Sequence, residues 1–506
     1  MKKIIIGLAV LTLLFASALT AYRIQPVRDA VADILPLGLK TKIKRTIFTS
    51  SALREDVAAL HQNLVERDKH IADLNTVLVK EKDRALKLED QMTFADLSGG
   101  AHSTWPKLAH AYSYSVNNLF VESAGVTTIK ASDGAEYLLT QFGLPFLPTA
   151  LGYGYKPLFF VDSTASDLYM ITGDGVVFKT NKKELDKKQI KLTSVPSNIR
   201  SVITDKAIFE ASWFSVKDLK ILNERAYISY NKKVGKDYTL AILSADLGQS
   251  PLVFEEFFSL SDPISIRDPF NAHQVGGRIV EFTDNQLLIS TGDYRKYEKA
   301  QDENSLLGKI FAIDIDTKAT RIISKGHRNA QGLEFNQASG TIVSTEHGPF
   351  GGDEINLNHL GSELDSKTIK NFGWPMASYG KHYDSRFHED APLHKSHSAH
   401  GFVEPLVNFT TSIGISQLVR VPNSFAPGFS NDYFAGSMGL NPAVPIFSIH
   451  HFRLNQANNA IIHQATIKIG ERIRDISVLD QTRLMLALEG NNTPAIGILQ
   501  SIKSNN

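Results

Sequence analysis

Three patterns of hydrophobic and polar residues follow one another along the chain. Residues 4–22 form an uninterrupted apolar run, and residues 23–50 mix prolines and a glycine with basic residues. In residues 51–97, apolar positions recur at alternating spacings of four and three, and in residues 105–506 short β-branched and aromatic runs alternate with Gly, Asp and Asn turns. These patterns predict, in order, a membrane-type helix, a linker, a long helix and a β-rich domain.

Residues 1–22 have the features of a segment that directs export. Lys2 and Lys3 precede a run of 19 residues without a charge, which is just long enough to span a hydrocarbon core as a helix. The sequence Ala-Ser-Ala at 16–18 resembles a cleavage site, so the segment is either an uncleaved signal anchor or a removed signal peptide. Both alternatives predict export to the periplasmic or extracellular side, and an uncleaved helix would anchor the chain in the inner membrane.

The long helix predicted at 51–97 carries a heptad seam. The seam runs from Leu53 to Met92 without a slip, and no Pro or Gly interrupts it. Arg67 and Glu81 occupy core positions, where polar residues weaken a seam but fix its register. A strict period of 3.5 is typical of a coiled coil and predicts a homo-oligomer, either a dimer or a trimer. The alternative is a single amphipathic helix that packs on the following domain.

The β-rich region, residues 105–506, contains no long helical pattern between its predicted strands. This disfavours a parallel α/β fold, in which helices alternate with strands. Roughly 400 residues of short strands predict a large closed β architecture, and a β-propeller closes a chain of this size by radial repetition. The repeats are too weak in sequence to give the number of blades.

Composition narrows the class of protein further. The chain has 54 Lys and Arg against 53 Asp and Glu, a net charge of +1, which argues against a general nucleic-acid binder because such proteins show a basic excess. It has no cysteine, which excludes disulfides, thiol catalysis and thiolate metal sites.

The richest chemistry lies between Gly326 and Tyr379. Arg328-Asn329 pairs a fixed cation with an amide that both donates and accepts, which suits a planar, multiply anionic ligand. Gly348-Pro349 leaves carbonyl oxygens accessible in a loop, and Asp353-Glu354 follow at once. Carbonyls beside carboxylates are hard oxygen ligands, which suit Ca²⁺. The alternative is a glycine-rich connection between blades whose charges only hydrogen-bond the backbone.

Ordered motifs in this stretch resemble a known family. They read Gly-His-Arg-Asn-x-Gln-Gly-Leu at 326–333, Glu-His-Gly-Pro-x-Gly-Gly-Asp-Glu-Ile-Asn-Leu at 346–357 and Asn-x-Gly-Trp-Pro at 371–375. Blocks at 277–310 and 471–475 agree with the same pattern. The chain is similar here to the soluble aldose sugar dehydrogenases of the glucose/sorbosone dehydrogenase family. The resemblance implies an all-β, six-bladed β-propeller that uses pyrroloquinoline quinone (PQQ) and Ca²⁺.

The resemblance also implies roles for individual residues. The cofactor-binding positions of the family correspond to Arg328, Asn329, Arg472 and Arg474. The positions that offer carbonyls to the catalytic Ca²⁺ correspond to Gly348 and Pro349, with Asp353 in support.

The general base of the family is a histidine that lies four residues before the arginine of a Gly-Arg pair. That arginine is Arg278 here, and the position four residues before it is Gln274, whereas His273 lies five before it. A one-residue bulge would aim His273 inward, but a regular strand would turn it to the opposite face. We expect His273 to be the base that takes the proton of the sugar hydroxyl while hydride passes to the quinone.

Two further groups of histidines stand out. Five crowd a charged loop that contains proline, and the loop is interpreted as solvated and as a candidate for substrate specificity, with a metal site as the alternative: His382, His388, His394, His397 and His400. His450-His451 lies at a strand end and is interpreted as structural.

The sequence therefore predicts PQQ- and Ca²⁺-dependent oxidation of an aldose sugar to its lactone, with an unknown electron acceptor. The alternative is a non-catalytic, membrane-tethered propeller that binds a glycan or a protein partner.

Overall fold

The computed structural model describes most of the β-rich region. The described residues are 117–144, 158–209, 212–265, 271–360, 364, 368–383, 387–439, 447–489 and 494–502. The predicted anchor at 1–22, linker at 23–50 and coiled coil at 51–97 lie outside them. Among the described residues, no helix has the length and hydrophobicity needed to cross a membrane.

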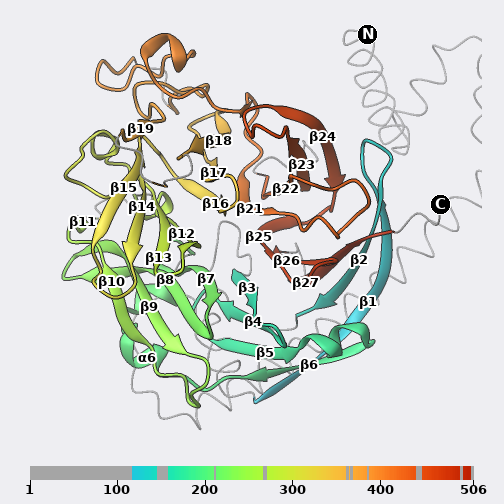
Figure 1. Ribbon diagram of the computed structural model, residues 1–506. Helices are drawn as coiled ribbons and strands as arrows, with labels where there is room; N and C mark the ends of the chain where they lie inside the picture. Colours follow the sequence, from blue (N-terminus) through green and yellow to red (C-terminus); the bar gives the residue numbers. More distant parts are fainter. Residues whose placement is uncertain are drawn as a thin grey trace, which may run out of the picture. The chain divides into compact units, whose positions relative to one another are not determined.

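Six antiparallel sheets of four principal strands surround a common axis in the described part of the chain (Figure 1). Blade 1 contains β3 (Phe159–Ser163), β4 (Asp167–Thr172), β5 (Val177–Asn181) and β6 (Gln189–Ser194). Blade 2 contains β7 (Val216–Leu222), β8 (Arg225–Val234), β9 (Asp237–Asp246) and β10 (Glu255–Ser259), with β11 (Ile264–Ser265) paired to β9. Blade 3 contains β12 (Gly276–Thr283), β13 (Gln286–Thr291), β14 (Lys309–Asp314) and β15 (Thr320–Lys325), with β19 (Lys370–Asn371) at its edge.

The remaining blades complete the ring. Blade 4 contains β16 (Ala330–Asn336), β17 (Thr341–Glu346), β18 (Asp353–His359) and β20 (Val407–Phe409). Blade 5 contains β21 (Ile415–Arg420), β22 (Asp432–Ser437), β23 (Ser448–Leu454) and β24 (Ile461–Lys468). Blade 6 contains β25 (Arg472–Val478), β26 (Arg483–Glu489), β27 (Ala495–Ser501) and β2 (Glu136–Gly143). The predicted propeller is thus confirmed, with the six blades that the resemblance implied.

Helical elements in the described residues are short. They are α6 (Ile199–Val202), η1 (Lys182–Asp186), η2 (Lys206–Phe209), η3 (Ser212–Phe214), η4 (Asn271–His273), η5 (Tyr297–Ala300) and η6 (Ser398–His400).

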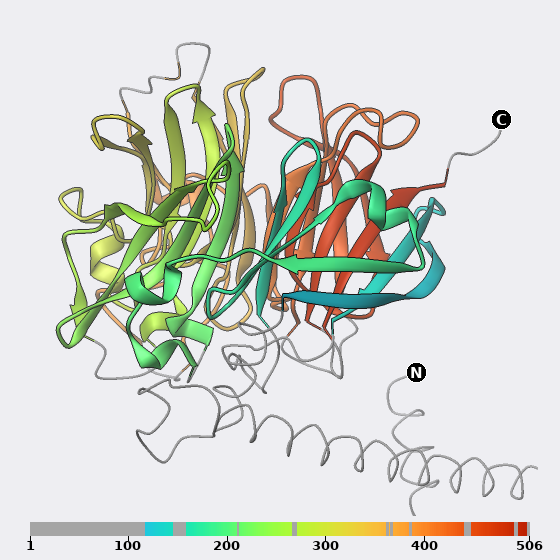
Figure 2. The ribbon, with the colours of Figure 1, turned by 90° about the horizontal axis from the view of Figure 1, so that it is seen from below.

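The ring is closed by strands from the two ends of the propeller sequence. β2 pairs with the C-terminal strand β27, so blade 6 mixes early and late parts of the chain (Figures 1 and 2). The long strand β1 (Asn118–Lys130) pairs with β6 over residues 118–122 and with β2 over residues 123–130. It therefore joins blades 6 and 1 into one nine-stranded sheet.

Hydrophobic residues fill each of the six gaps between neighbouring blades. In β4, Leu168 and Met170 pack towards blade 6, whereas Tyr169 and Ile171 pack towards blade 2. Successive side chains of a strand point to opposite faces, so a strand between two blades must be apolar on both. This explains why the strand runs were nearly continuous in hydrophobic residues rather than alternating.

Arg278, on β12, joins innermost strands across the axis. Its Nη1 donates to Asp218 Oδ1 on β7 and Asp475 Oδ1 on β25, at 2.8 Å each. Its Nε donates to the Gln331 carbonyl at 2.6 Å, and its Nη2 to the Arg474 carbonyl at 3.0 Å. The side chain is only 2% exposed, so this one guanidinium fixes the spacing of four inner strands.

Candidate functional site

The predicted site residues lie where innermost strands begin. Arg328 and Asn329 directly precede β16, Arg472 opens β25, and His273 ends the turn η4 before β12. Gly348 lies in the turn between β17 and β18. Since corresponding strands of a propeller run in the same direction around its axis, these residues share one end of the ring.

Arg328 is buried and is held by carbonyl groups. Its Nη1 donates to the carbonyls of His347 at 2.9 Å and Gly348 at 2.6 Å. The guanidinium lies 5.4 Å from the ring of Trp374 and 5.9 Å from the ring of Tyr383. The carbonyl that the resemblance assigned to Ca²⁺ is therefore bonded to a cation of the chain itself.

A buried carboxylate shapes the turn that carries Arg328 and Asn329. Glu346 Oε1 accepts the backbone N–H groups of both residues, with 2.9 Å to Asn329 N. Glu346 Oε2 lies 3.0 Å from Nδ1 of His327, whose Nε2 lies 2.8 Å from Ser324 Oγ. His327 is therefore a positioning residue, a role that sequence reasoning missed although the histidine stands inside the motif.

Asn329 connects two blades. Its Oδ1 accepts from Gly276 N at the start of β12 at 3.1 Å, and from Gln331 Nε2 at 2.9 Å. The amide is thus tied to the start of the strand that follows His273.

Asp353 accepts hydrogen bonds from backbone N–H groups in two neighbouring blades. Its Oδ2 accepts the N–H groups of Ile413, Gly414 and Ile415 at 2.8–3.2 Å. Its Oδ1 accepts from Gly348 N at 3.2 Å. The carboxylate therefore supports the Gly348 turn and fastens blade 4 to blade 5.

The turn of Gly348 and Pro349 is covered by the following loop. Phe350 and Lys381 exchange backbone hydrogen bonds of 3.0 and 2.9 Å, and Gly380 packs against Pro349. A Cβ on Gly348 would collide with the Gly352 backbone, so the tight turn requires glycine there.

Arg472 and Arg474 share one acid. Arg472 Nε donates to Glu489 Oε2 at 3.0 Å, and Arg474 Nε donates to Glu489 Oε1 at 2.6 Å. Arg472 also donates to the carbonyls of Met438 and Gly439. Burial holds the pKa of Lys217 well below its usual range, and the positive charge of Arg474 lowers this pKa further. Two guanidinium groups on one carboxylate leave a local excess of positive charge around Glu489.

Gln274 contacts Arg328. The amide of Gln274 fits with its oxygen accepting from Arg328 Nη2 at 2.9 Å and its nitrogen donating to Asp293 Oδ1 at 2.6 Å. His273 lies edge-on to the ring of Trp213, with centroids 4.3 Å apart. The bulge considered from the sequence is present, but the register shift lies between Gly276 and Ile279, after both residues. Gly276 and Gly277 have φ values of 67° and 101°, a backbone that glycine adopts readily.

Asp293 is a further residue of this cluster. It is fully buried, and it accepts from Trp374 Nε1 at 2.7 Å and Arg295 N at 2.8 Å. Burial raises its pKa to about 6, against the opposing charge of Arg328. Asp293 lies in the block at 277–310 that resembles the family, but the resemblance gave no sign of this contact.

The histidine-rich loop is more packed than expected from the sequence. His397 is buried and lies 3.6 Å from Glu354 Oε1, and burial lowers its pKa. His394 and His400 stack with centroids 3.7 Å apart. The interpretation of this loop as solvated is therefore wrong at His397, because the loop folds over the turn that follows β17.

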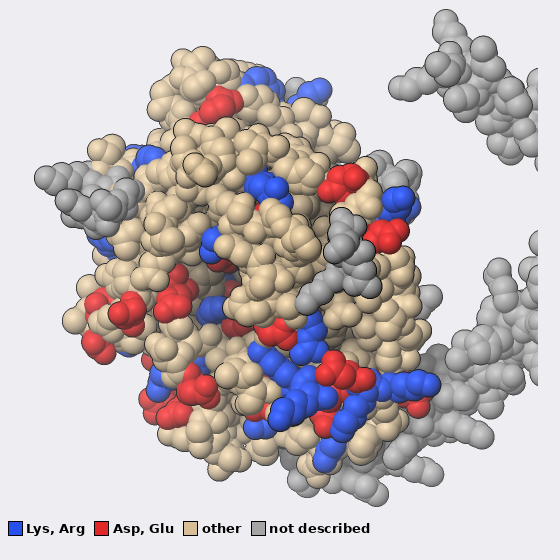
Figure 3. Space-filling model, turned by 45° about the vertical axis from the view of Figure 1, so that its right-hand side comes forward, with Lys and Arg blue, Asp and Glu red and all other residues tan. Residues whose placement is uncertain are grey.

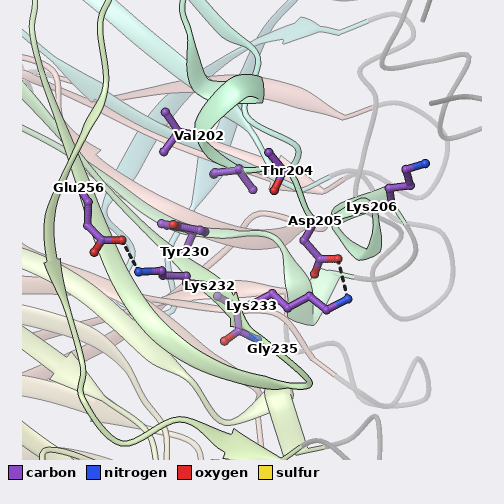
Figure 4. A pocket seen from close by; sticks show the side chains of 11 residues that line it. Val202, Thr204, Asp205, Lys206, Tyr230, Lys232, Lys233, Gly235 and Glu256 are labelled. Carbon is purple, nitrogen blue, oxygen red and sulfur yellow. Dashed lines mark hydrogen bonds and ion pairs between the residues drawn. The ribbon is translucent and has the colours of Figure 1, made fainter. Parts of the chain in front are cut away.

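A separate cavity of about 530 Å³ lies beside blade 2 (Figure 4). Its lining includes Lys232 and Lys233, which pair with Glu256 at 2.5 Å and with Asp205 at 3.5 Å. Its Asn231 accepts from Tyr294 OH and donates to the Trp213 carbonyl. The cavity is thus linked by hydrogen bonds to the residues beside His273, while the two lysines have acidic partners within it.

Known proteins are similar to this chain in sequence and in fold. The family model for glucose/sorbosone dehydrogenase matches residues 221–496. An uncharacterized protein of Synechocystis is 32% identical over 240 residues, covering 43% of this chain and 54% of that protein, so the match spans about half of that relative. Aldose sugar dehydrogenase YliI of Escherichia coli is 27% identical over 272 residues, covering 50% of this chain and 67% of the enzyme.

Solved structures agree on the fold. The soluble aldose sugar dehydrogenase of Escherichia coli in its apo-form has a TM-score of 0.54 and 16% identity, over 75% of this chain and 99% of that one. A glucose dehydrogenase has a TM-score of 0.53 and 20% identity, over 75% of this chain and all of the other. With the family model matching more than half of its length, this chain belongs to the glucose/sorbosone dehydrogenase family.

Proposed function

We propose that this protein is an exported sugar dehydrogenase that oxidises an aldose to its lactone and binds PQQ at the end of the axis where Arg328, Arg472 and Arg474 lie. Family membership and the activity named for the Escherichia coli relative support this proposal. The observation that carries it is the local excess of positive charge around the buried Glu489, whose single carboxylate serves two arginines.

The residues fit a planar, multiply anionic cofactor. An anion placed beside Arg474 would relieve the repulsion that contributes to the low pKa of Lys217. Arg328 offers a guanidinium next to aromatic rings, an environment that also suits a flat conjugated ligand. Bound PQQ would supply the hydride acceptor.

Gly348, Pro349 and Asp353 do not fit Ca²⁺ with the hydrogen bonds that they make in this structure. Calcium takes six to eight oxygen ligands, but the Gly348 carbonyl accepts from Arg328, and the carboxylate of Asp353 accepts four backbone N–H groups. Calcium binding at Gly348 and Pro349, with Asp353 in support, would require Arg328 to move. Calcium binding there remains a prediction from the family resemblance.

The chain itself has to bind, orient and accept a proton. Arg328 and Asn329 would hold the quinone side of the cofactor, and Arg472 and Arg474 its carboxylates. His273 would take the proton of the sugar hydroxyl on a ring nitrogen, since a neutral imidazole accepts protons near neutral pH.

One observation favours a second candidate, a propeller that binds a glycan or protein partner without catalysis. Gln274, an amide that cannot act as a base, makes the contact with Arg328. On the face shown in Figure 3, Lys and Arg side chains gather in the lower part with Asp and Glu side chains among them, and this mixture of charges does not select a class of partner. Membrane attachment and oligomerisation through residues 51–97 remain predictions.

The test uses the purified full-length chain. PQQ binding is measured by quenching of tryptophan fluorescence, and turnover by reduction of an artificial electron-accepting dye with a panel of aldoses, with and without Ca²⁺. We expect PQQ to bind, Arg474→Ala to weaken binding, and His273→Ala to abolish turnover while binding remains.

The outcomes separate the alternatives. Absence of PQQ binding at micromolar cofactor would sink the dehydrogenase proposal. Binding without turnover of any aldose would favour the second candidate. Full turnover by His273→Ala would show that another group is the base. Arg483→Met, at a surface ion pair of blade 6, serves as the control that should change neither PQQ binding nor turnover.

A further inference from the structure

We propose that His451, His463 and Asp133 form a Zn²⁺ site that fastens the turn between β1 and β2 to blade 5. One potential ligand atom from each of these residues lies within 4.8 Å of the other two, in a cluster found among the described residues. The cluster belongs to outer strands, β23 and β24, and not to the set of residues that begin the innermost strands.

Strand register brings the two histidines together. On β23 and β24, His451 is opposite Ala465 and His463 is opposite Arg453. The two histidines are therefore diagonal neighbours on one face, which is within reach of long side chains. Their ring centroids are 4.8 Å apart.

Backbone contacts fix the third ligand. Ser132 N donates to the Thr466 carbonyl at 3.0 Å, and Thr466 N donates to Ser132 Oγ at 2.9 Å. These bonds attach the turn between β1 and β2 to β24. Asp133 Oδ2 then lies 3.1 Å from His463 Nε2.

A second, independent observation points to a ligand. His451 is 3% exposed, and its Nδ1 has no hydrogen-bond partner among the residues that the structure describes. Its Nε2 lies 2.6 Å from Asp432 Oδ1, and Asp432 is itself held by Arg453 Nε at 2.9 Å. A carboxylate that accepts from one imidazole nitrogen fixes the tautomer and leaves a lone pair on the other, as in carboxylate–histidine–zinc groups. A buried acceptor without a donor is unfavourable, and a metal ion would satisfy it.

The ligand types select the metal. Two imidazoles and one carboxylate suit Zn²⁺, whereas Ca²⁺ and Mg²⁺ prefer oxygen ligands throughout. Asp133 is exposed and His463 is half-buried, so the ion has a route from solvent and a water can take the fourth position. The site would join an early turn to two late strands and so stabilise ring closure.

The experiment uses the full-length chain without PQQ, treated with a chelator and then freed of it. Bound zinc per chain is counted by mass spectrometry after desalting, affinity is measured by competition with a chromophoric chelator, and Tm is measured with and without ZnCl₂. The variants His463→Gln and Asp133→Asn alter side chains that are partly exposed, so the fold should persist.

We expect one Zn²⁺ per chain, a rise in Tm on adding zinc, and at least a tenfold loss of affinity in both variants. The matched control is His400→Gln, which removes one member of the stacked pair with His394 and should leave zinc binding unchanged. Absence of zinc binding would overturn the proposal and leave His463 and Asp133 as a hydrogen-bonded pair. Zinc binding that is lost in His400→Gln but kept in the other two variants would also overturn it.

Discussion

Replacing Arg278 by methionine tests how much the ion pairs at the axis stabilise the fold. Methionine matches the aliphatic stem of arginine but removes the guanidinium that contacts Asp218 and Asp475. Each carboxyl then retains one backbone donor, Ile279 N at 2.8 Å for Asp218 and Val161 N at 3.1 Å for Asp475. Removing one partner of a buried ion pair costs about 3–5 kcal/mol, a large part of the roughly 5–15 kcal/mol that stabilises a typical protein.

The pH dependence separates this electrostatic cost from a loss of packing. Burial raises the pKa of Asp218 and raises that of Asp475 to about 7, with Arg278 opposing both shifts. For Asp475, the stability contribution is fully present below the unfolded value of 3.8 and is lost as pH rises to about 7. Without Arg278 the folded pKa rises further, so the loss continues above pH 7.

The gap in unfolding free energy between wild type and Arg278→Met should therefore widen above pH 7. The slope is about 1.4 kcal/mol per pH unit for each carboxyl that stays protonated. Urea unfolding at pH 6, 7 and 8, followed by circular dichroism, measures this gap. Arg483→Met, at a surface pair, is the control and should cost about 1 kcal/mol or less. A cost below about 1 kcal/mol for Arg278→Met, or a gap that is equal at all three pH values, would refute the reasoning.

Two further predictions concern the substitution of buried carboxyl groups. Burial raises the pKa of Asp293 to about 6, so wild type loses stability between pH 4 and 6. Asp293→Asn should therefore gain about 3 kcal/mol relative to wild type as pH rises from 4 to 7, at 1.4 kcal/mol per unit, and equal pH slopes in urea unfolding would contradict this. Asp353→Asn turns an NH₂ towards N–H donors and should cost about 1–3 kcal/mol, whereas the exposed Asp316→Asn should change the unfolding free energy by less than about 0.5 kcal/mol. An equal effect of these last two substitutions would show that the four bonds to Asp353 do not support the turn.

The fold was predictable because its determinants are local. Short apolar runs and turn residues predicted a closed β architecture, and motifs in fixed order implied six blades. The pairing of β1 with both β6 and β2 was not predictable, because no local pattern specifies which distant edge a strand meets. The register change between Ser123 and Val126 in β1 is likewise a property of the assembled ring.

The site was predictable in its residue types but not in its contacts. Arg328 and Asn329 lie at the end of the axis where the innermost strands begin, yet the bonds from Arg328 to two carbonyls depend on how the loop after β17 turns. The orientation of Gln274 and His273 depends on where the bulge falls, and two glycines in a left-handed backbone placed it at Gly276 and Gly277. The contact of Asp293 with Trp374 joins parts of the chain that no spacing rule relates.

The pairing of β2 with β27 also orders the events of biosynthesis. β2 is among the first strands of the propeller to be made, but its partner β27 follows more than 350 residues later. Until β27 has been made, β2 has one edge without its final partner, and such an edge can recruit strands of other chains. The closing contacts also span almost the whole propeller sequence, so they form late and slowly. A chain made only as far as blade 5 therefore presents the unpaired edge of β2 to other chains until blade 6 is complete.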